Sequence, residues 1–171
     1  GDIFASKTGS TEKVLYWIRV HASEKEGGGY KFVPAFQDGV SSKPDTYKFQ
    51  ISALPGQNDT NAGETVKISK ADIGPLVDTT DTTSDKPNMV DITNVHEATI
   101  LENLRRRYAR DEFMTAVGPI LVVINPFKYH AGKYGQDVIK RYHNDATLNI
   151  EKPHVYDLAE RAFKSLASER I

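Results

Sequence analysis

The sequence predicts a mixed α+β chain, in which a small antiparallel β-barrel is followed by helices and by one apolar strand. Three observations indicate this class. Four short strand-like runs follow one another early in the chain, helical periodicity appears only in its second part, and residues 120–124 are five consecutive apolar residues. Such a run fits a strand that is covered on both faces of a parallel or mixed sheet.

Composition and length limit the possible functions. The 171 residues suit one ordinary domain, or one small domain joined to part of another. A formal net charge of −1 lacks the basic balance of a nucleic-acid-binding protein, so no nucleic-acid partner is expected. No apolar run approaches the roughly 20 residues that span a bilayer, and the first residues do not resemble a signal peptide. We therefore expect no transmembrane segment and a cytoplasmic location.

The predicted barrel occupies residues 14–76, after a mobile arm at residues 1–13. Its strand-like runs are residues 14–20, 30–36, 47–53 and 66–68, and the last two alternate apolar with polar side chains. Pro34 predicts an edge position or a bulge in the second run, because proline cannot donate to a strand ladder. Short strands with Gly and Pro turns predict an SH3-like barrel.

Residues 77–88 are rich in Asp, Thr and Ser and predict an exposed linker. A helix is expected after it, with Ile100 or Leu101, Leu104 and Tyr108 on one face and with Asn94 and Glu97, three residues apart, as its cap.

Three consecutive arginines, residues 105–107, point in different directions around that helix. We therefore expect solvated side chains with one fixed salt bridge rather than a phosphate site. A last helix is expected from Pro153, with an apolar stripe that belongs to the core. The stripe consists of Val155, Leu158, Ala159, Ala162, Phe163 and Leu166.

Several residues of the second part match one known pattern, in order and at nearly the same spacing. They are Ile92, Val95, His96, Glu97, Leu101, Leu104, Arg107, Tyr108, Phe113, Thr115, Gly118, Asn125, Pro126, Phe127, Lys128, Tyr134, Pro153, His154, Val155 and Tyr156. Together they resemble the start of a myosin motor domain. The resemblance covers most of the chain from about residue 14 and is looser in the barrel.

The resemblance implies that residues 89–171 are the incomplete N-terminal segment of a P-loop-type α/β motor domain, with residues 120–124 as its first core strand. The parent protein would be an actin-based, ATP-driven motor with Mg²⁺ as cofactor and light chains or calmodulin on its neck, associated with the cytoskeleton. The phosphate-loop motif Gly-x-x-x-x-Gly-Lys-Ser/Thr does not occur in these 171 residues. We therefore expect no catalytic residue, no metal ligand and no ATPase activity in the chain alone.

The resemblance also assigns the purine side of the nucleotide site to Asn125, Pro126 and Tyr134. An amide can donate to and accept from a base edge, while proline and tyrosine rings offer flat apolar walls. Lys128, which matches a family lysine, either contacts nucleotide or is a surface charge, and Tyr129 follows it. The alternative to a motor segment is a freestanding SH3-like module with a helical extension that binds a peptide or a partner protein.

Overall fold

A computed structural model of the chain describes residues 14–54, 61–145 and 152–168. It divides into two compact units, Gly1–Val77 and Asp78–Ile171. Each unit is described by itself. The predicted arm at residues 1–13 lies outside the described residues.

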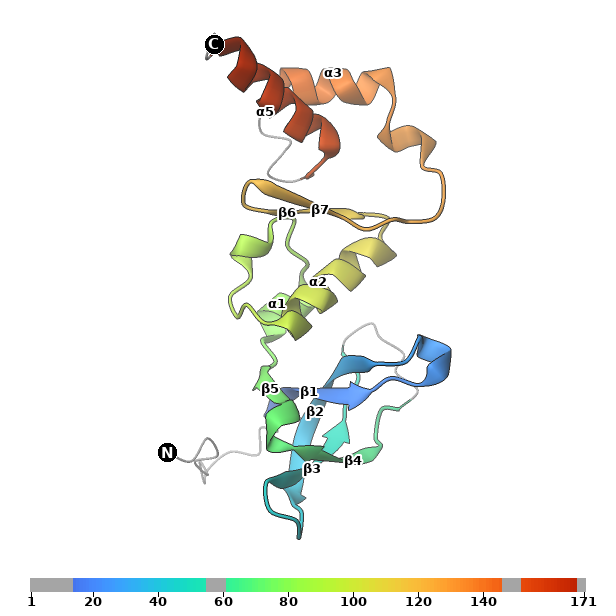
Figure 1. Ribbon diagram of the computed structural model, residues 1–171, viewed down its shortest axis with the longest axis vertical. Coiled ribbons are helices and arrows are strands. Elements are labelled where there is room, and N and C mark those ends of the chain that lie inside the picture. The colour runs from blue at the N-terminus through green and yellow to red at the C-terminus, as the bar shows by residue number, and fades with distance from the viewer. Residues whose placement is uncertain (1–13, 55–60, 146–151, 169–171) are drawn as a thin grey trace. The chain divides into compact units, whose positions relative to one another are not determined.

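The first unit is built on one antiparallel sheet of five strands in the order β4-β3-β2-β1-β5 (Figure 1). The strands are β1 (Leu15–His21), β2 (Tyr30–Val40), β3 (Thr46–Ile51), β4 (Thr65–Ser69) and β5 (Ile73–Leu76), with 3₁₀ turns at Glu24–Glu26 and Lys70–Asp72. The antiparallel strands confirm the predicted class. In the described part of the chain, β4 and β5 form the two edges and are not paired with each other, so the hydrogen bonds do not close a barrel.

Alternating side chains of these strands form the core of the first unit. Its buried members are Ile18, Val33, Ala35, Phe49, Ile51 and Ile68, with Tyr16, Val20, Tyr47, Val66 and Ile73 packed around them. Phe49 is fully buried, and the Tyr16 ring meets it edge-on at a centroid distance of 6.1 Å. The period of two in the sequence therefore places one face of the sheet in the core.

The prediction for Pro34 is wrong, because β2 is a central strand with β1 and β3 on either side. Pro34 pairs with Trp17 of β1, and its carbonyl accepts a hydrogen bond of 2.8 Å from the Ser52 amide, one residue beyond the end of β3. Its nitrogen faces the same side as its carbonyl, where the ladder with β3 ends, so the absent N–H affects only the last pair of that ladder. The bulge of β2 lies between Gln37 and Val40 instead, where Gly39 has a φ of 120°.

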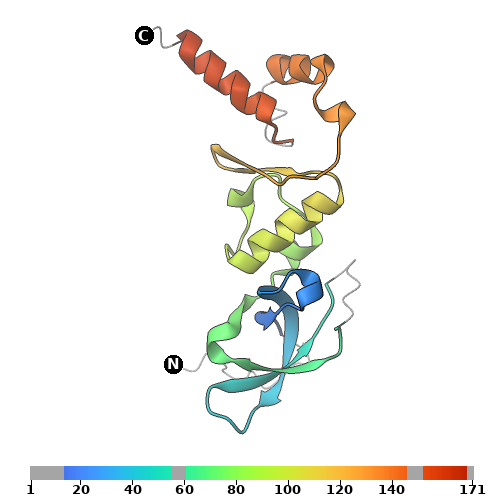
Figure 2. The ribbon, with the colours of Figure 1, turned by 45° about the vertical axis from the view of Figure 1, so that its right-hand side comes forward.

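The second unit consists of helices packed around a two-stranded antiparallel hairpin. Its elements are α1 (Thr79–Thr83), a 3₁₀ turn (Met89–Asp91), α2 (Glu97–Ala109), β6 (Met114–Val117), β7 (Ile120–Val123), η4 (Ala131–Lys133), α3 (Gln136–Asn144) and α5 (Val155–Ser168). The hairpin of β6 and β7 lies between α2 on one side and α3 and α5 on the other in both views (Figures 1 and 2). No helix among the described residues is both long and apolar enough to cross a membrane.

The segment predicted as an exposed linker is ordered. It contains α1, whose first turn is capped by the Asp78 carboxylate at 2.8 Å from the Thr80 amide, and Thr82 is buried. Farther along, the Asn103 side chain accepts from the Lys86 amide at 2.6 Å and donates to the Lys86 carbonyl at 3.0 Å. Polar side chains therefore fix this segment where apolar ones are scarce.

Helix α2 differs from its prediction at the cap and on its buried face. His96 is the N-cap: its Nδ1 accepts from the Ala98 amide at 3.2 Å, and Thr99 Oγ1 accepts from the His96 amide at 3.0 Å. Leu101 and Tyr108, two of the residues expected on one apolar face, are 50% and 38% exposed. The helix instead buries a largely polar face, consisting of Ala98, Thr99, Glu102, Asn103 and Arg107.

Arg107 is the centre of that polar face, at 3% exposure. Its guanidinium donates to Thr115 Oγ1 at 2.9 Å and to the Met114 carbonyl at 2.9 Å, and it forms an ion pair of 3.1 Å with Asp85. Burial lowers the pKa of Arg107, and the negative charge of Glu112 opposes this effect. The prediction of one fixed salt bridge among solvated arginines is wrong, because Arg105 and Arg106 form ion pairs as well as Arg107.

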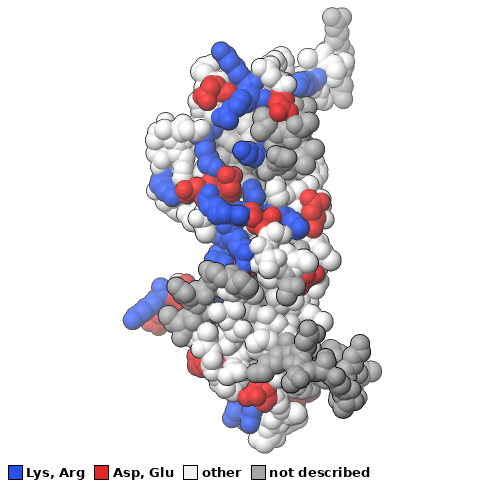
Figure 3. Space-filling view, turned by 180° about the vertical axis from the view of Figure 1, so that it is seen from behind, with Lys and Arg blue, Asp and Glu red and all other residues white. Residues whose placement is uncertain are grey.

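The two neighbouring arginines share the carboxylate of Glu102, which is buried. Arg105 and Arg106 each lie 2.7 Å from the carboxylate of Glu102. On the face seen in Figure 3, Lys and Arg side chains lie beside Asp and Glu side chains. This pairing agrees with the expectation that the arginine run is not a phosphate site.

Two elements predicted to be buried are exposed. Strand β7 has only the antiparallel partner β6, and its Ile120 and Val123 are 63% and 49% exposed. Helix α5 begins at Val155, two residues after Pro153, and has no buried residue in its described part; Phe163 and Leu166 are 63% and 74% exposed. The apolar patterns correctly predict a strand and a helix, but nothing among the described residues covers the outer faces of β7 and α5.

Candidate functional site

The candidate site begins where β7 ends. The Ile124 amide donates to the Phe113 carbonyl at 2.9 Å, and the chain then leaves the hairpin at Asn125. Asn125 is exposed, and its Oδ1 accepts from the Phe127 amide at 2.9 Å. This turn leaves the NH₂ group of Asn125 and one lone pair of its oxygen for an outside partner.

The loop after Asn125 has an unusual backbone and an exposed aromatic surface. Phe127 has a φ of 50°, a conformation that few residues other than glycine adopt. Phe127 and Tyr129 are 90% and 87% exposed, whereas Pro126 is half-buried, and its carbonyl lies 3.4 Å from the Tyr108 hydroxyl. The loop is thus held from behind and presents flat side chains outward.

Tyr134 stands at the other end of the loop, directly after η4. Its ring is 42% exposed and lies near the rings of His154, at 5.6 Å, and Tyr156, at 6.4 Å and nearly perpendicular. The Tyr156 hydroxyl donates to the Tyr134 carbonyl at 2.9 Å. These contacts fix the position of Tyr134 and leave part of its ring accessible.

Lys128 is engaged within the chain. Its Nζ lies 2.6 Å from the Asp111 carboxylate. The hydrogen bond raises the pKa of Lys128 and lowers the pKa of Asp111. In this structure Lys128 is a surface charge with a specific intramolecular partner, and its contact with nucleotide stays a prediction.

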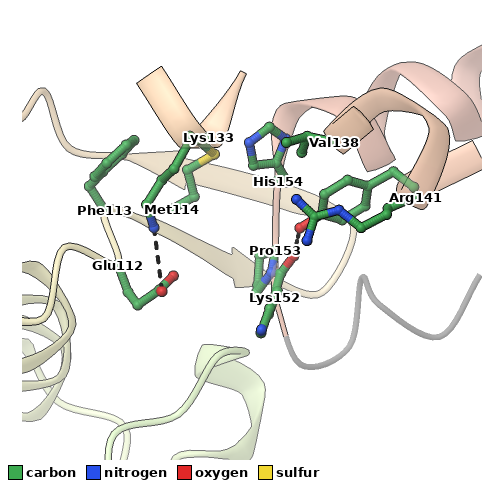
Figure 4. A pocket seen from close by; sticks show the side chains of 11 residues that line it. Glu112, Phe113, Met114, Lys133, Val138, Arg141, Lys152, Pro153 and His154 are labelled. Carbon is green, nitrogen blue, oxygen red and sulfur yellow. Dashed lines mark hydrogen bonds and ion pairs between the residues drawn. The ribbon is translucent and has the colours of Figure 1, made fainter. Parts of the chain in front are cut away.

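A cavity of about 180 Å³ lies next to this loop, between the hairpin, α3 and the start of α5 (Figure 4). Its walls include Phe113, Lys133, Tyr142 and His154, and an ion pair of 3.4 Å joins Lys133 to Glu112 at one side. None of the five residues assigned from the sequence lines it. The loop contributes Gly132 and Lys133 to the cavity wall, but not the residues assigned to the purine.

His154 lies beside the Tyr134 ring of the loop and also lines the cavity. It is 6% exposed, its Nδ1 accepts from the Tyr156 amide at 3.1 Å, and its Nε2 has no hydrogen-bond partner among the described residues. Burial lowers the pKa of His154, and the Lys133 backbone opposes this shift. Because Nδ1 accepts a hydrogen bond, the neutral ring carries its proton on Nε2, and the residue caps the start of α5 and packs on Tyr142.

Sequence comparisons show which family the chain belongs to. A family model described as "Myosin head (motor domain)" matches residues 86–171. The chain belongs to the myosin head family. The match includes α2, the hairpin, the loop and α5, and it favours the motor segment over the freestanding module.

Individual relatives agree with the family match. The chain is 37% identical over 86 residues to Myosin-M heavy chain of Dictyostelium discoideum, a match that covers 50% of this chain and 5% of that protein. It is 38% identical over 82 residues to Myosin IA heavy chain of the same organism, covering 48% and 8%. It is 32% identical over 104 residues to Myosin-2 of Arabidopsis thaliana, covering 61% and 8%. The chain thus corresponds to a small part of these relatives.

Sequence reasoning missed the residues that support the loop. Asp111 and His130 stand outside every motif, and Phe113 is only one of the residues that carry the resemblance. The one available signal was their closeness in sequence to the hairpin. A hairpin brings the residues before its first strand beside those after its second strand.

Proposed function

We propose that this chain is the N-terminal part of an actin-based, ATP-driven myosin motor and that its loop from Asn125 to Tyr134 forms the purine side of the ATP site. The observation that carries the proposal is the exposed loop within the family match, with an available amide at one end and a partly open aromatic ring at the other. An SH3-like character of the first unit, Mg²⁺, actin and light chains or calmodulin belong to the same proposal for the whole protein.

The chemistry of the loop fits a purine. The NH₂ group of Asn125 can donate to a ring nitrogen of adenine, and its oxygen can still accept from the exocyclic amine. Pro126 and Tyr134 supply apolar surfaces for a flat base. Tyr129, fully exposed beside Lys128, lies on the outward side of the same loop, where it can widen the aromatic surface.

Hydrolysis requires more than this loop. A phosphate site needs backbone N–H groups, a lysine and a hydroxyl that binds Mg²⁺, and the motif that delivers them does not occur in the 171 residues. We therefore assign base recognition to this chain and the catalytic steps to further parts of the motor.

The first test concerns Asn125 and Tyr134 in the whole motor. Replacing either with alanine should weaken ATP and ADP by similar factors, about 1 to 2 kcal/mol each, because a hydrogen bond or a ring contact to the base is lost. The base is held equally in the ground and transition states, so KM should rise while kcat changes little. Transient kinetics with ATP, ADP and inorganic triphosphate would measure this.

Asn144→Ala is the matched control, because Asn144 is an exposed amide at the end of α3. It should leave all three ligands unaffected. If Asn125→Ala abolished hydrolysis while nucleotide affinity stayed intact, or weakened inorganic triphosphate as strongly as ATP, the assignment of this loop to the purine would be wrong.

A second test uses the 171-residue chain itself. It should neither hydrolyse ATP nor bind it more tightly than about millimolar, because charge-assisted phosphate contacts provide much of the affinity for a nucleotide. Isothermal titration calorimetry with ATP would measure the constant. A micromolar value would show that these residues contain a phosphate site and would contradict the division of roles.

A further inference from the structure

One short segment, residues 108–113 between α2 and β6, supports most of the loop. The contacts are Tyr108 hydroxyl to Pro126 carbonyl at 3.4 Å, Asp111 to Lys128 at 2.6 Å, Glu112 to Lys133 at 3.4 Å, Phe113 carbonyl to Ile124 amide at 2.9 Å, and the Phe113 ring to the His130 ring at 5.0 Å. The contacts are spread over the loop from Ile124 to Lys133. A single segment therefore holds the loop along its length, between Asn125 and Tyr134.

The centre of this support is buried. Phe113 is 3% exposed, the His130 side chain is 15% exposed, and Lys133 Nζ lies 5.1 Å from the centre of the Phe113 ring. His130 Nε2 lies 3.9 Å from the same Asp111 oxygen that Lys128 contacts. Asp111 thus faces two side chains of the loop.

Asp111 also occupies a position where glycine is the common residue. Helix α2 ends with the Asp111 amide bonded to the Tyr108 carbonyl at 3.0 Å and the Glu112 amide bonded to the Arg107 carbonyl at 2.9 Å. This pair of bonds is the Schellman motif, and its left-handed residue is usually glycine. Asp111 adopts a φ of 60° there. The helix end would accept glycine with less strain, so the cap does not explain the carboxylate.

We propose that Asp111 is a positioning residue for the nucleotide loop: its carboxylate holds Lys128 and faces His130, and so keeps Asn125 and Tyr134 in place to receive a base. This inference rests on the proposed function of the loop. It assigns Lys128 to the loop's support and not to direct contact with nucleotide.

Asp111→Gly separates this role from an effect on folding. Glycine satisfies the positive φ and should keep or raise the stability of α2, while it removes the carboxylate. In the 171-residue chain, the amides of residues 125–134 should exchange with deuterium faster, by about two- to five-fold, because an exposed ion pair contributes modestly. The amides of α2 should not exchange faster.

Lys128→Met should produce the same change, and the double variant should add little to either single variant, since both remove one interaction. The matched control is Asp137→Asn, which breaks an exposed ion pair of 3.6 Å with Arg141 on α3. It should leave exchange in the loop unchanged. Unchanged loop exchange in Asp111→Gly, or full additivity of the two variants, would overturn the inference.

The whole motor supplies the second readout. Asp111→Gly should weaken ATP by about two- to five-fold and leave inorganic triphosphate unaffected, because only the base side of the site is loosened. If Asn125→Ala weakens ATP but Asp111→Gly does not, the positioning role fails while the purine loop stands. If neither variant affects ATP although the loop exchanges faster, the proposed function fails.

Discussion

Replacing Arg107 with methionine should lower the free energy of unfolding of the second unit by about 3 to 5 kcal/mol. Methionine has a similar length, but it leaves Thr115 and the Met114 carbonyl without their buried donor and removes one of the cations beside Asp85. Each buried group that loses its partner costs about 1 to 3 kcal/mol. Arg110 also pairs with Asp85 and keeps that carboxylate from being left alone.

Arg105→Met is the control on the same helix. The Arg105 side chain is 49% exposed, and Arg106 still pairs with Glu102 in its absence, so its loss should cost less than about 1 kcal/mol. The α-helices of the described chain all belong to the second unit, so the helical circular dichroism signal reports its unfolding. Equal shifts of the denaturation midpoint in the two variants would contradict the central place of Arg107.

In the first unit, Phe49→Ala should have the largest effect, about 3 to 5 kcal/mol. Phe49 lies at the centre of the core cluster with no exposed surface. Alanine would leave a cavity against Tyr16 and the surrounding aliphatic side chains, and a strand core cannot close it without breaking its register.

The single tryptophan of the chain, Trp17, lies in β1 and reports on the first unit through its fluorescence. Phe49→Ala should lower the denaturation midpoint seen by fluorescence and leave the helical signal nearly unchanged. Arg107→Met should do the reverse. Val40→Ala, at a site that is 69% exposed on β2, is the control. If both probes moved together in either variant, the two units would not unfold independently.

Several features follow from local sequence. The alternation in residues 47–53 and 66–68 predicts strands with one buried face, and β3 and β4 confirm it. The helical period after residue 97 predicts α2, and three consecutive arginines can place at most one or two on a given face. These features are local because backbone geometry fixes the repeats of 2.0 and 3.6 residues.

The burial of these elements does not follow from the local repeat. The apolar run of β7 and the stripe of α5 predict an interior, yet Ile120 and Phe163 are exposed, because burial depends on segments that pack from elsewhere. Conversely, α2 buries Asn103 and Arg107, because Lys86, Asp85 and Thr115 supply partners for their polar groups.

The candidate site likewise depends partly on local sequence and partly on the tertiary structure. Sequence alone determined which loop resembles the purine loop of the family, since Asn125, Pro126 and Tyr134 stand in the family's order after an apolar strand. Only the tertiary structure decided that Lys128 is held by Asp111 and that His130 packs on Phe113. The physical reason is that a local pattern specifies the conformation of a segment, whereas the partner of a charge or a ring is whichever group the fold brings within a few ångströms.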